Sequence, residues 1–555
     1  MNLFKNMLFL TIVLLLLQSQ IARTQVSDNR PNVLFIIVDD LNDYVSGLDG
    51  HPQARTPNIS KLAQSGVFFK NAYTNCPLCS PSRSSLFTGI YPHNSKKFTN
   101  ESKWFNNPVL KNCKTLMEYF DENGYYVTGS GKLLHSNLKK LWDEWGVDVN
   151  NYGPFAYDGN KTVGHPSVPE PFRSIGAVDG SFAPLSCVPT FPDSVSQGRQ
   201  TGWIYSTWGG KDKKEGEFLN YVNSDHRDLM PDEMHAQWAV KKIEALEKRQ
   251  DLQPFFMGVG FVRPHTPLYA PQKYFDMFPL EEIQLPVILE GDNRDTYYDL
   301  VYCNEKKEIS DYRNPMVRIP NTKKGPLYYR TLKASYPDIK TGLKHFLQAY
   351  LACIAFVDDQ IGIVLNALNN SRFRENTIVV LVSDHGWNMG EKEYLFKNSL
   401  WEESTRVPLI IKVPGFSVPG LEIDHPVSLI DIYPTLVDLC NLRGNTMKND
   451  MGGHLDGYSL KPFLQDPECK NWKGPNGALT VVYGGLNNEN IYKQSYSYRT
   501  KDWRYIRYYN GLEELYFHKG DPYEWHNLAY DKRFIEVKMK LKEQLMKLLK
   551  NKHSE

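Results

Sequence analysis

Residues 32–40 read NVLFIIVDD, an unbroken run rich in Val and Ile that ends in two aspartates. A run of this kind is typical of a strand that is buried on both faces of a parallel sheet. Residues 377–386, TIVVLVSDHG, repeat the pattern, again with an aspartate shortly after the apolar run. Residues 254–261 (PFFMGVGF) and 407–413 have the same character, so we expect all of these segments to form inner strands.

Helical patterns lie between these runs, at residues 231–250 and 343–369. Strands that alternate with helices predict a layered α/β domain. Two other stretches, residues 150–225 and 285–335, lack clear periodicity and are rich in Gly, Pro, Tyr and Asn. Long irregular segments of a compact domain are usually functional surface loops, which is the role that we expect for both.

The chain has 555 residues, which exceeds the usual size of a single domain. After about residue 441 the pattern changes. Residues 495–509 alternate aromatic and polar side chains as an antiparallel hairpin does, Asn510-Gly511 indicates a turn, and residues 534–549 have the pattern of a Lys-rich amphipathic helix. We therefore predict a main domain over residues 28–440 and a C-terminal subdomain over residues 441–555, with an antiparallel sheet and a terminal helix.

The N-terminus has the features of an export signal. Lys5 provides a positive charge, and residues 7–17 form an apolar run without charge that is too short to span a bilayer comfortably. We predict a signal peptide over residues 1–24 and a secreted or periplasmic protein, or a lysosomal one in a eukaryote. A retained N-terminal anchor is the alternative, and we expect no other transmembrane segment.

The overall composition is that of an ordinary globular protein, with 41% hydrophobic and 23% charged residues. The formal net charge of +1 gives no basis for binding nucleic acid or an anionic membrane. Any binding of anions must therefore come from a local cluster of side chains.

Eight cysteines in an exported chain could form disulfides, but they are too sparse for a disulfide scaffold and the sequence does not give their pairing. Cys76 and Cys79 form a C-x-x-C motif, which suggests redox chemistry or zinc binding. No second C-x-x-C or histidine pair accompanies the motif in the sequence, so zinc is weakly supported.

Acidic residues follow two of the predicted strands. Asp39 and Asp40 end the first run, and Asp384 and His385 end the run that begins at residue 377. The carboxyl edge of the sheet is where open α/β folds build their sites. Three carboxylates at one edge would repel one another unless a cation neutralises them, and oxygen ligands favour calcium or magnesium over zinc. Each pair alone could instead cap a following helix.

Residues 79–83, Cys-Ser-Pro-Ser-Arg, predict the start of a helix. Proline is favoured at the first helical position, and Ser80 is a good N-cap just before Pro81. Cys79 would then lie at a helix N-terminus, where the backbone N–H groups and the helix dipole favour an anion. A half-cystine, paired with Cys76 or another cysteine, is the alternative.

The same segment resembles the maturation signature of the type I, formylglycine-dependent sulfatase family, because Cys79-x-Pro81-Ser82-Arg83 is followed by Leu86-x-Thr88-Gly89. Ile90 stands where that family usually has Arg. The likeness extends over nearly all of residues 30–530, with gaps in the two irregular stretches. It is carried further by Asp39-Asp40, Thr56-Pro57-Asn58, Gly131-Lys132-x-x-His135, Arg263-Pro264-His265, Ser383-Asp384-His385-Gly386-Trp387, Lys397 and Tyr498-Arg499-Thr500. The Lys132-x-x-His135 spacing and the Asp-His-Gly-Trp segment are most similar to the iduronate-2-sulfatase group.

The resemblance implies an alkaline-phosphatase-like fold, in which helices flank a layered mixed sheet and a smaller α+β subdomain follows. It implies that a formylglycine-generating or anaerobic sulfatase-maturating enzyme converts Cys79 to formylglycine, an aldehyde. One hydroxyl of the hydrated aldehyde would attack sulfur. The second could then lose its proton and expel sulfate, which an ordinary serine cannot do.

The family also implies a role for each matched residue. One Ca²⁺ would bind to Asp39, Asp40, Asp384, His385 and an oxygen of the modified Cys79. Arg83 would hold the aldehyde hydrate, and Lys132 and Lys397 would bind sulfate oxygens. His135 would take the proton that releases sulfate and His265 would protonate the leaving sugar oxygen, although the two histidines could exchange roles.

The predicted function is therefore hydrolysis of sulfate esters on a carbohydrate, such as a glycosaminoglycan or an algal polysaccharide that contains uronic acid. Aromatic side chains in or near the irregular stretches, among them Tyr152 and Trp203, could stack on sugar rings. Hydrolysis of phosphomonoesters or phosphonate esters is one alternative, which the single visible set of metal ligands disfavours. A secreted carbohydrate-binding protein with a dead site is another, which the presence of every matched residue disfavours.

Overall fold

A nine-stranded mixed sheet forms the centre of the computed structural model, which describes residues 30–136, 138–206, 216–298, 321–485 and 490–550. The strands run in the order β13-β2-β12-β11-β1-β9-β3-β4, with β14 paired to β2. Their bounds are β1 Asn32–Val38, β2 Val67–Tyr73, β3 Tyr126–Gly131, β4 Glu144–Trp145, β9 Phe255–Phe261, β11 Thr377–Ser383, β12 Arg406–Lys412, β13 Leu421–Ile423 and β14 Val427–Ser428.

The predicted inner strands are confirmed, and they lie side by side. β1 is parallel to both of its neighbours, because it pairs with β11 on one side and β9 on the other. The register places Val38 opposite both Ser383 and Phe261, so the three strands end at the same level. β12 is antiparallel to β11, which makes the sheet mixed, as expected.

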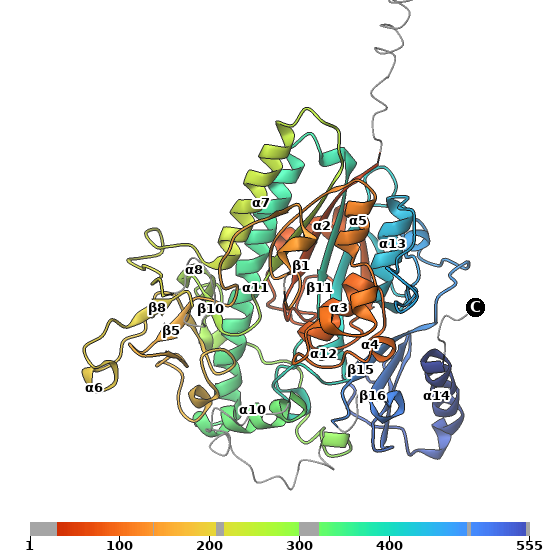
Figure 1. Cartoon of the computed structure of the whole chain (residues 1–555). Helices are drawn as coiled ribbons and strands as arrows, with labels where there is room; N and C mark the ends of the chain where they lie inside the picture. Colours follow the sequence, from red (N-terminus) through yellow and green to blue (C-terminus); the bar gives the residue numbers. More distant parts are fainter. Residues whose placement is uncertain (1–29, 137, 207–215, 299–320, 486–489, 551–555) are drawn as a thin grey trace, which may run out of the picture.

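Helices cover both faces of the sheet (Figure 1). Alternate side chains of β1 point to opposite faces, as the pleat of a strand requires. Leu34, Ile36 and Val38 join the same hydrophobic cluster as α2 (Pro57–Ser65), α7 (Pro231–Glu247) and α11 (Ile339–Asn369). Val33, Phe35 and Ile37 join a second cluster with α3 (Cys79–Thr88), α5 (Leu116–Glu122) and α13 (Ile432–Leu439). This arrangement explains why the run at residues 32–38 carries no polar face.

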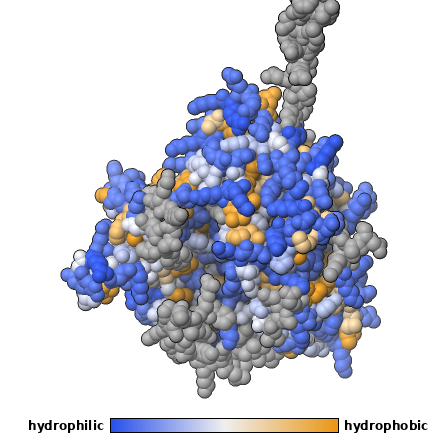
Figure 2. Space-filling model, viewed as in Figure 1, coloured by the Kyte–Doolittle hydropathy of each residue, from blue (hydrophilic) through white to orange (hydrophobic). Residues whose placement is uncertain are grey.

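The longest described helix, α11, is long and apolar enough to cross a membrane by length and composition. However, 78% of its most apolar window is buried inside the protein, where it packs against α7 and α2. Burial of this kind is typical of a core helix in a globular domain. The face of the molecule in Figure 2 is mostly hydrophilic, with hydrophobic side chains scattered among polar ones.

A second sheet lies near the C-terminal end of the chain. Its strands are β15 (Gly477–Val482), β16 (Ser495–Thr500), β17 (Trp503–Arg507) and β18 (Glu513–Phe517), all antiparallel, and α14 (Ile535–Lys550) packs against it. The predicted hairpin at residues 495–509 and the terminal helix are thus confirmed. The backbone N–H of Val481 donates to the carbonyl of Asn75 at 2.9 Å, which ties this sheet to the segment just before Cys79.

The irregular stretches contain more regular structure than their sequence suggests. Residues 150–206 include a small sheet of β5 (Phe155–Tyr157), β6 (Thr162–Val163) and β8 (Gly202–Ile204). The second stretch ends in α10 (Asn321–Ser335), which the sequence did not predict because Gly325 and Pro326 interrupt the helical pattern. The predicted signal peptide at residues 1–24 lies outside the described residues.

Candidate active site

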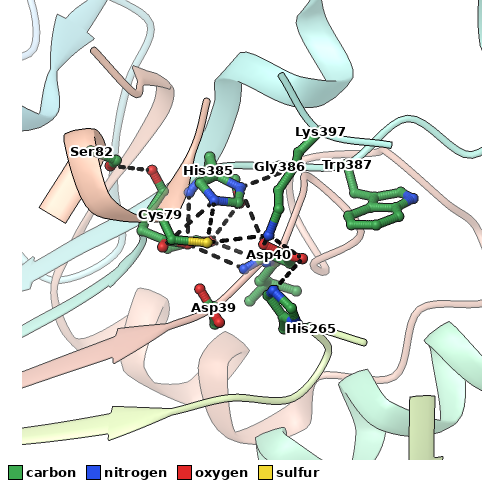
Figure 3. Close-up of polar contacts among 12 residues, drawn as sticks. Asp39, Asp40, Cys79, Ser82, His265, His385, Gly386, Trp387 and Lys397 are labelled. Carbon is green, nitrogen blue, oxygen red and sulfur yellow. Dashed lines mark hydrogen bonds and ion pairs between the residues drawn. The ribbon is translucent and has the colours of Figure 1, made fainter. Parts of the chain in front are cut away.

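The side chains that follow the carboxyl ends of β1, β3, β9 and β11 meet at one buried site, called the pocket below. Figure 3 shows the part of it around Cys79. The pocket lies at the sheet edge at which the sequence predicted a site. Each strand is followed within four residues by matched side chains, while Cys79 and Arg83 come from α3 and Lys397 from a loop. In the order of the chain, the residues are Asp39 and Asp40 after β1, Lys132 and His135 after β3, His265 after β9, and Asp384 and His385 after β11.

Asp39 and Asp40 contact different parts of the pocket, although they are neighbours in the chain. Asp40 has a φ of 60°, a left-handed conformation that is rare for a residue other than glycine and costs about 1–3 kcal/mol. Its N–H donates to Oδ1 of Asp384 at 3.2 Å. Asp39 contacts Lys132 and Arg83, whereas Asp40 contacts Lys397. No helix begins after either aspartate or after Asp384, so these carboxylates do not act as helix caps.

Four of the predicted metal ligands lie close enough together to hold one ion. Ligand atoms of Asp39, Asp40, Cys79 and His385 all lie within 4.8 Å of one another, and all four residues are buried. Asp384 lies beside this group, since its Oδ2 is 3.7 Å from Nε2 of His385. Carboxylate oxygens are the ligands that calcium and magnesium prefer, so the donor set fits a hard divalent cation.

His385 is the nitrogen donor of this group. Burial disfavours its charged form, but the charges of Asp384, Cys79 and Asp40 outweigh burial and raise its pKa to about 9. An imidazole must be neutral to bind a metal ion, so a cation and a proton compete for this side chain.

Cys79 is the first residue of α3, two positions before the predicted first helical residue Pro81. Leu78 is the N-cap, and Ser80 lies inside the first turn, where its N–H donates to Oδ1 of Asn100 at 2.9 Å. The prediction of Ser80 as the cap was therefore wrong. Pro81 is the third helical residue and is tolerated there because the first-turn N–H groups have no partner inside the helix. Cys79 nevertheless lies at a helix N-terminus, as predicted, and both Cys79 and Cys76 are free thiols rather than half-cystines.

Positive groups surround the sulfur of Cys79 (Figure 3). Nζ of Lys397 lies 3.2 Å and Nε2 of His385 lies 3.3 Å from Sγ. Burial alone raises the pKa of the Cys79 thiol, but the charges of Lys132, Lys397 and His385 and a hydrogen bond with His135 hold it well below its usual value. The position therefore stabilises a negatively charged atom on residue 79.

Arg83 is fully buried and links two strand ends. Its Nε donates to Oδ2 of Asp384 at 2.8 Å, and one terminal nitrogen donates to Oδ1 of Asp39 at 3.1 Å. The other terminal nitrogen donates to the carbonyl oxygens of Lys132 and, at 3.0 Å, Leu133. Arg83 thus fixes both carboxylates and the chain that carries Lys132. Its predicted contact with a hydrated residue 79 stays a prediction.

The remaining cation and imidazole side chains border the same pocket. Nζ of Lys132 contacts the carboxylate of Asp39, and Nζ of Lys397 lies 2.7 Å from Oδ1 of Asp40. Nε2 of His265 is 3.7 Å from Oδ2 of Asp40. The structure therefore brings all of the predicted site residues together, and their individual roles stay predictions.

Two features of the pocket were missed in the sequence. Ser82 lies within the quoted motif but received no role, and its hydroxyl donates to the carbonyl of Asp384 at 2.6 Å. Gly131 has a φ of +87°, and a Cβ at this position would lie 2.0 Å from the carbonyl oxygen of Gly260. The Gly131-Lys132 pair was a usable signal, because glycine before a site residue often marks a close backbone approach.

Comparisons with known proteins agree with this geometry. The family model described as "Sulfatase" matches residues 31–442, and the one described as "N-sulphoglucosamine sulphohydrolase, C-terminal" matches residues 390–551. The chain is 34% identical to a sulfatase from Formosa agariphila over 91% of this chain and 84% of that protein. It is 26% identical to iduronate 2-sulfatase from Mus musculus over 90% of this chain and 91% of that protein.

A solved structure of similar fold is the phosphonate monoester hydrolase of Agrobacterium radiobacter, with a TM-score of 0.64, 22% identity and coverage of 94% of this chain and 95% of that one. The similarity to iduronate 2-sulfatase does not assign the chain to that group, which stays a prediction. The match to the sulfatase model spans most of the chain and includes every predicted site residue. The chain therefore belongs to the sulfatase family and is a sulfuric ester hydrolase.

Proposed function

We propose that this enzyme removes sulfate from a carbohydrate, with a formylglycine made from Cys79 as the nucleophile and one Ca²⁺ in the acidic cluster. The observation that carries the proposal is the surroundings of residue 79. It lies at the start of α3, within 3.3 Å of both Lys397 and His385 and inside the cluster formed with Asp39 and Asp40. These surroundings favour an anionic oxygen at position 79.

The two implied groups supply chemistry that the unmodified chain lacks. A hydrated aldehyde at position 79 supplies one hydroxyl for attack on sulfur and another whose ionisation expels sulfate. A divalent cation would supply positive charge that stabilises the anionic oxygens of the reaction. Asp39, Asp40, Asp384 and His385 would hold that cation.

Lys132 and Lys397 would bind the sulfate oxygens. Their ammonium groups lie on the two sides of the acidic pair, on Asp39 and Asp40 respectively. Negative charge accumulates on sulfate oxygens and on the leaving oxygen in the transition state, and fixed cations in a buried pocket stabilise it. Arg83 would orient the nucleophile through the carboxylates that it holds.

His135 and His265 would move protons on opposite sides of the reaction. His135 contributes a hydrogen bond that lowers the pKa of Cys79, which supports a role in taking the proton from residue 79. Nδ1 of His265 is 2.5 Å from the carbonyl oxygen of Thr266, so Nε2 is the nitrogen that faces Asp40. This orientation supports His265 as the acid that protonates the leaving oxygen.

A carbohydrate substrate is supported by the relatives and by the surroundings of the pocket. Iduronate 2-sulfatase, whose name specifies a uronic acid, resembles this chain over 90% of its length. Trp203 is 1% exposed and belongs to the core, so it does not present its face to a sugar. Tyr152 contacts Lys132 and His265 directly, which places an aromatic ring next to the reacting groups.

The main experiment compares an aryl sulfate with the matched aryl phosphate, using enzyme produced with a formylglycine-generating enzyme and Ca²⁺. We expect kcat/KM to be higher for the sulfate. The reason is that one cluster of potential metal ligands lies beside Cys79, and the sequence shows no clear ligands for a second ion. The other such cluster in the described residues, Glu402, His518 and Glu524, is engaged by Arg499 and Arg504. Faster phosphate hydrolysis would overturn the assignment.

A panel of sulfated oligosaccharides then identifies the substrate. We expect release of inorganic sulfate from at least one uronic-acid-containing member and none with the Cys79→Ala variant. Binding of oligosaccharides without release of sulfate from any member would instead support a dead carbohydrate-binding protein.

A further inference from the structure

Tyr152 lies between the two side chains to which the proposed function gives sulfate binding and leaving-group protonation. Nζ of Lys132 lies 4.6 Å from the centroid of its ring, within the range of a cation–π interaction. The imidazole of His265 lies 5.0 Å from the same centroid at an interplanar angle of 74°, an edge-to-face contact. One aromatic ring therefore restrains both groups at once.

The backbone that carries Tyr152 is held by two buried side chains. Arg263, 1% exposed, donates to the carbonyl oxygens of Tyr152 at 3.3 Å and Gly153 at 3.0 Å. His235, 0% exposed, has its Nε2 2.8 Å from Oδ1 of Asn151. Burying an arginine and a histidine is costly unless their hydrogen bonds are made, so these contacts fix the loop firmly. A loop held in this way keeps the ring in one position.

Ordinary packing does not account for the position of the ring. Tyr152 is partly buried, yet it belongs to none of the three hydrophobic clusters among the described residues. Among the described residues, its ring contacts the ammonium of Lys132 and the imidazole of His265. Burial raises the pKa of the phenol to about 12, although Lys132 opposes this, so the hydroxyl stays neutral.

We infer that Tyr152 is a positioning residue of the sulfatase reaction, which acts through His265 and Lys132. This inference rests on the proposed function. An oxygen of the modified residue 79 would form a bond to sulfur as the bond between sulfur and the leaving oxygen breaks. The electron pair of the broken bond goes to the leaving oxygen, and the proton on Nε2 of His265 passes to it. The ring of Tyr152 fixes the imidazole for this transfer and covers the ammonium of Lys132, so that its charge is directed at the sulfate rather than at water.

Loss of the Tyr152 ring should slow esters with poor leaving groups most, because these depend on protonation of the leaving oxygen. A sugar alkoxide needs the proton, whereas 4-nitrophenolate leaves without it. The Tyr152→Leu variant should therefore lose kcat/KM on a sugar sulfate by about 10-fold more than on 4-nitrophenyl sulfate. The Tyr152→Phe variant keeps the ring and loses only the hydrogen bond between the hydroxyl and Lys132. Its losses on the two esters should therefore agree within about 3-fold, because the edge-to-face contact with His265 is kept.

The matched control is Tyr157→Leu, five positions along the same segment, whose ring packs edge-on against Phe218. It should leave both kcat/KM values unchanged. Circular dichroism and thermal unfolding check that each variant is folded, and Tyr152→Met replaces Tyr152→Leu if the latter does not fold. Equal losses on the two esters in Tyr152→Leu, or a difference between the esters in Tyr152→Phe as large as that in Tyr152→Leu, would overturn the inference. Failure of the unmodified enzyme to cleave either ester would instead contradict the proposed function.

Discussion

The ammonium nitrogen of Lys397 lies 3.2 Å from the sulfur of Cys79, although 318 positions separate the two residues in the chain. The same nitrogen lies 2.7 Å from Oδ1 of Asp40. Lys397 is 4% exposed, so little water screens its charge. A cation at this distance stabilises an anionic residue 79 and any sulfate oxygen next to it.

Removal of this cation should slow the reaction more than it weakens the fold. We expect Lys397→Ala to lower kcat/KM by about 10²–10³-fold, because one preorganised charge in a buried site contributes that much. Lys397→Arg should restore part of the loss, since it keeps the charge with a different geometry. Steady-state kinetics measure the effect, and Lys241→Ala on the exposed side of α7 is the control. An unchanged kcat/KM in Lys397→Ala would exclude the proposed role.

A divalent cation should stabilise the folded protein as well as activate it. Calcium at about 100 times its Kd should raise the free energy of unfolding by about 2.7 kcal/mol, and chelation should reverse this and abolish activity. Asp40→Asn should lose the calcium-dependent shift in Tm because it removes a charged ligand. Asp49→Asn, which changes an exposed aspartate nine positions along the chain, should keep the calcium-dependent shift. A calcium shift of the same size in Asp40→Asn would place the ion elsewhere.

Serine at position 79 should trap the reaction half-way. It offers one hydroxyl for attack but lacks the second hydroxyl that expels sulfate, so we expect Cys79→Ser to stop after one turnover. Intact mass spectrometry after incubation with an aryl sulfate should detect an adduct of about 80 Da, the mass of a transferred sulfo group. Cys79→Ala should acquire no adduct. Sustained turnover by Cys79→Ser would mean that the second hydroxyl is not needed.

Acid should weaken the contact between α12 (Glu402–Thr405) and the C-terminal sheet. Glu524 is 1% exposed and bonds Arg504 and His518. Burial alone raises its pKa, but Arg504 and His518 outweigh burial and lower it to about 2. A carboxyl with a lowered pKa stabilises the fold above its unfolded pKa of about 4.3, and this contribution is lost as the pH falls toward 2.

Urea unfolding at several pH values tests this network. Glu524→Gln should lower the free energy of unfolding by about 1–3 kcal/mol at pH 7, because it removes one of the two carboxylates that the buried Arg504 contacts. It should also flatten the decline between about pH 4.3 and 2. Glu375→Gln, whose side chain is 76% exposed, should change neither quantity. If the free energy of unfolding of Glu524→Gln still falls fully between about pH 4.3 and 2, other carboxyls cause the decline.

The sequence predicted those parts of the fold that local patterns determine. β1 was predicted to within a residue because a strand buried on both faces has an unbroken apolar run. α10 was missed because Gly325 and Pro326 lie inside it and tertiary packing overrides their low helix propensity. The start of α3 was placed two residues late, since cap residues locate helix ends only approximately.

The site was predicted unevenly for a similar reason. Asp39, Asp40 and Asp384 follow recognisable strands, so their convergence could be inferred from the sheet edge alone. Lys397 and His265 sit on loops, and only their resemblance to family motifs connected them with Cys79. The position of Tyr152 over Lys132 had no signal in the sequence, because its loop has no periodicity and is fixed by the distant residues Arg263 and His235.

The mass of residue 79 in active enzyme is the critical measurement for the proposed nucleophile. Trypsin releases residues 71–83 as one peptide, in which Cys76 serves as an internal control for thiol alkylation. In enzyme produced with a formylglycine-generating enzyme, we expect an alkylated Cys76 and a residue 79 that is about 18 Da lighter than cysteine and not alkylated. A fully active preparation in which residue 79 is an alkylated, unmodified cysteine would contradict it.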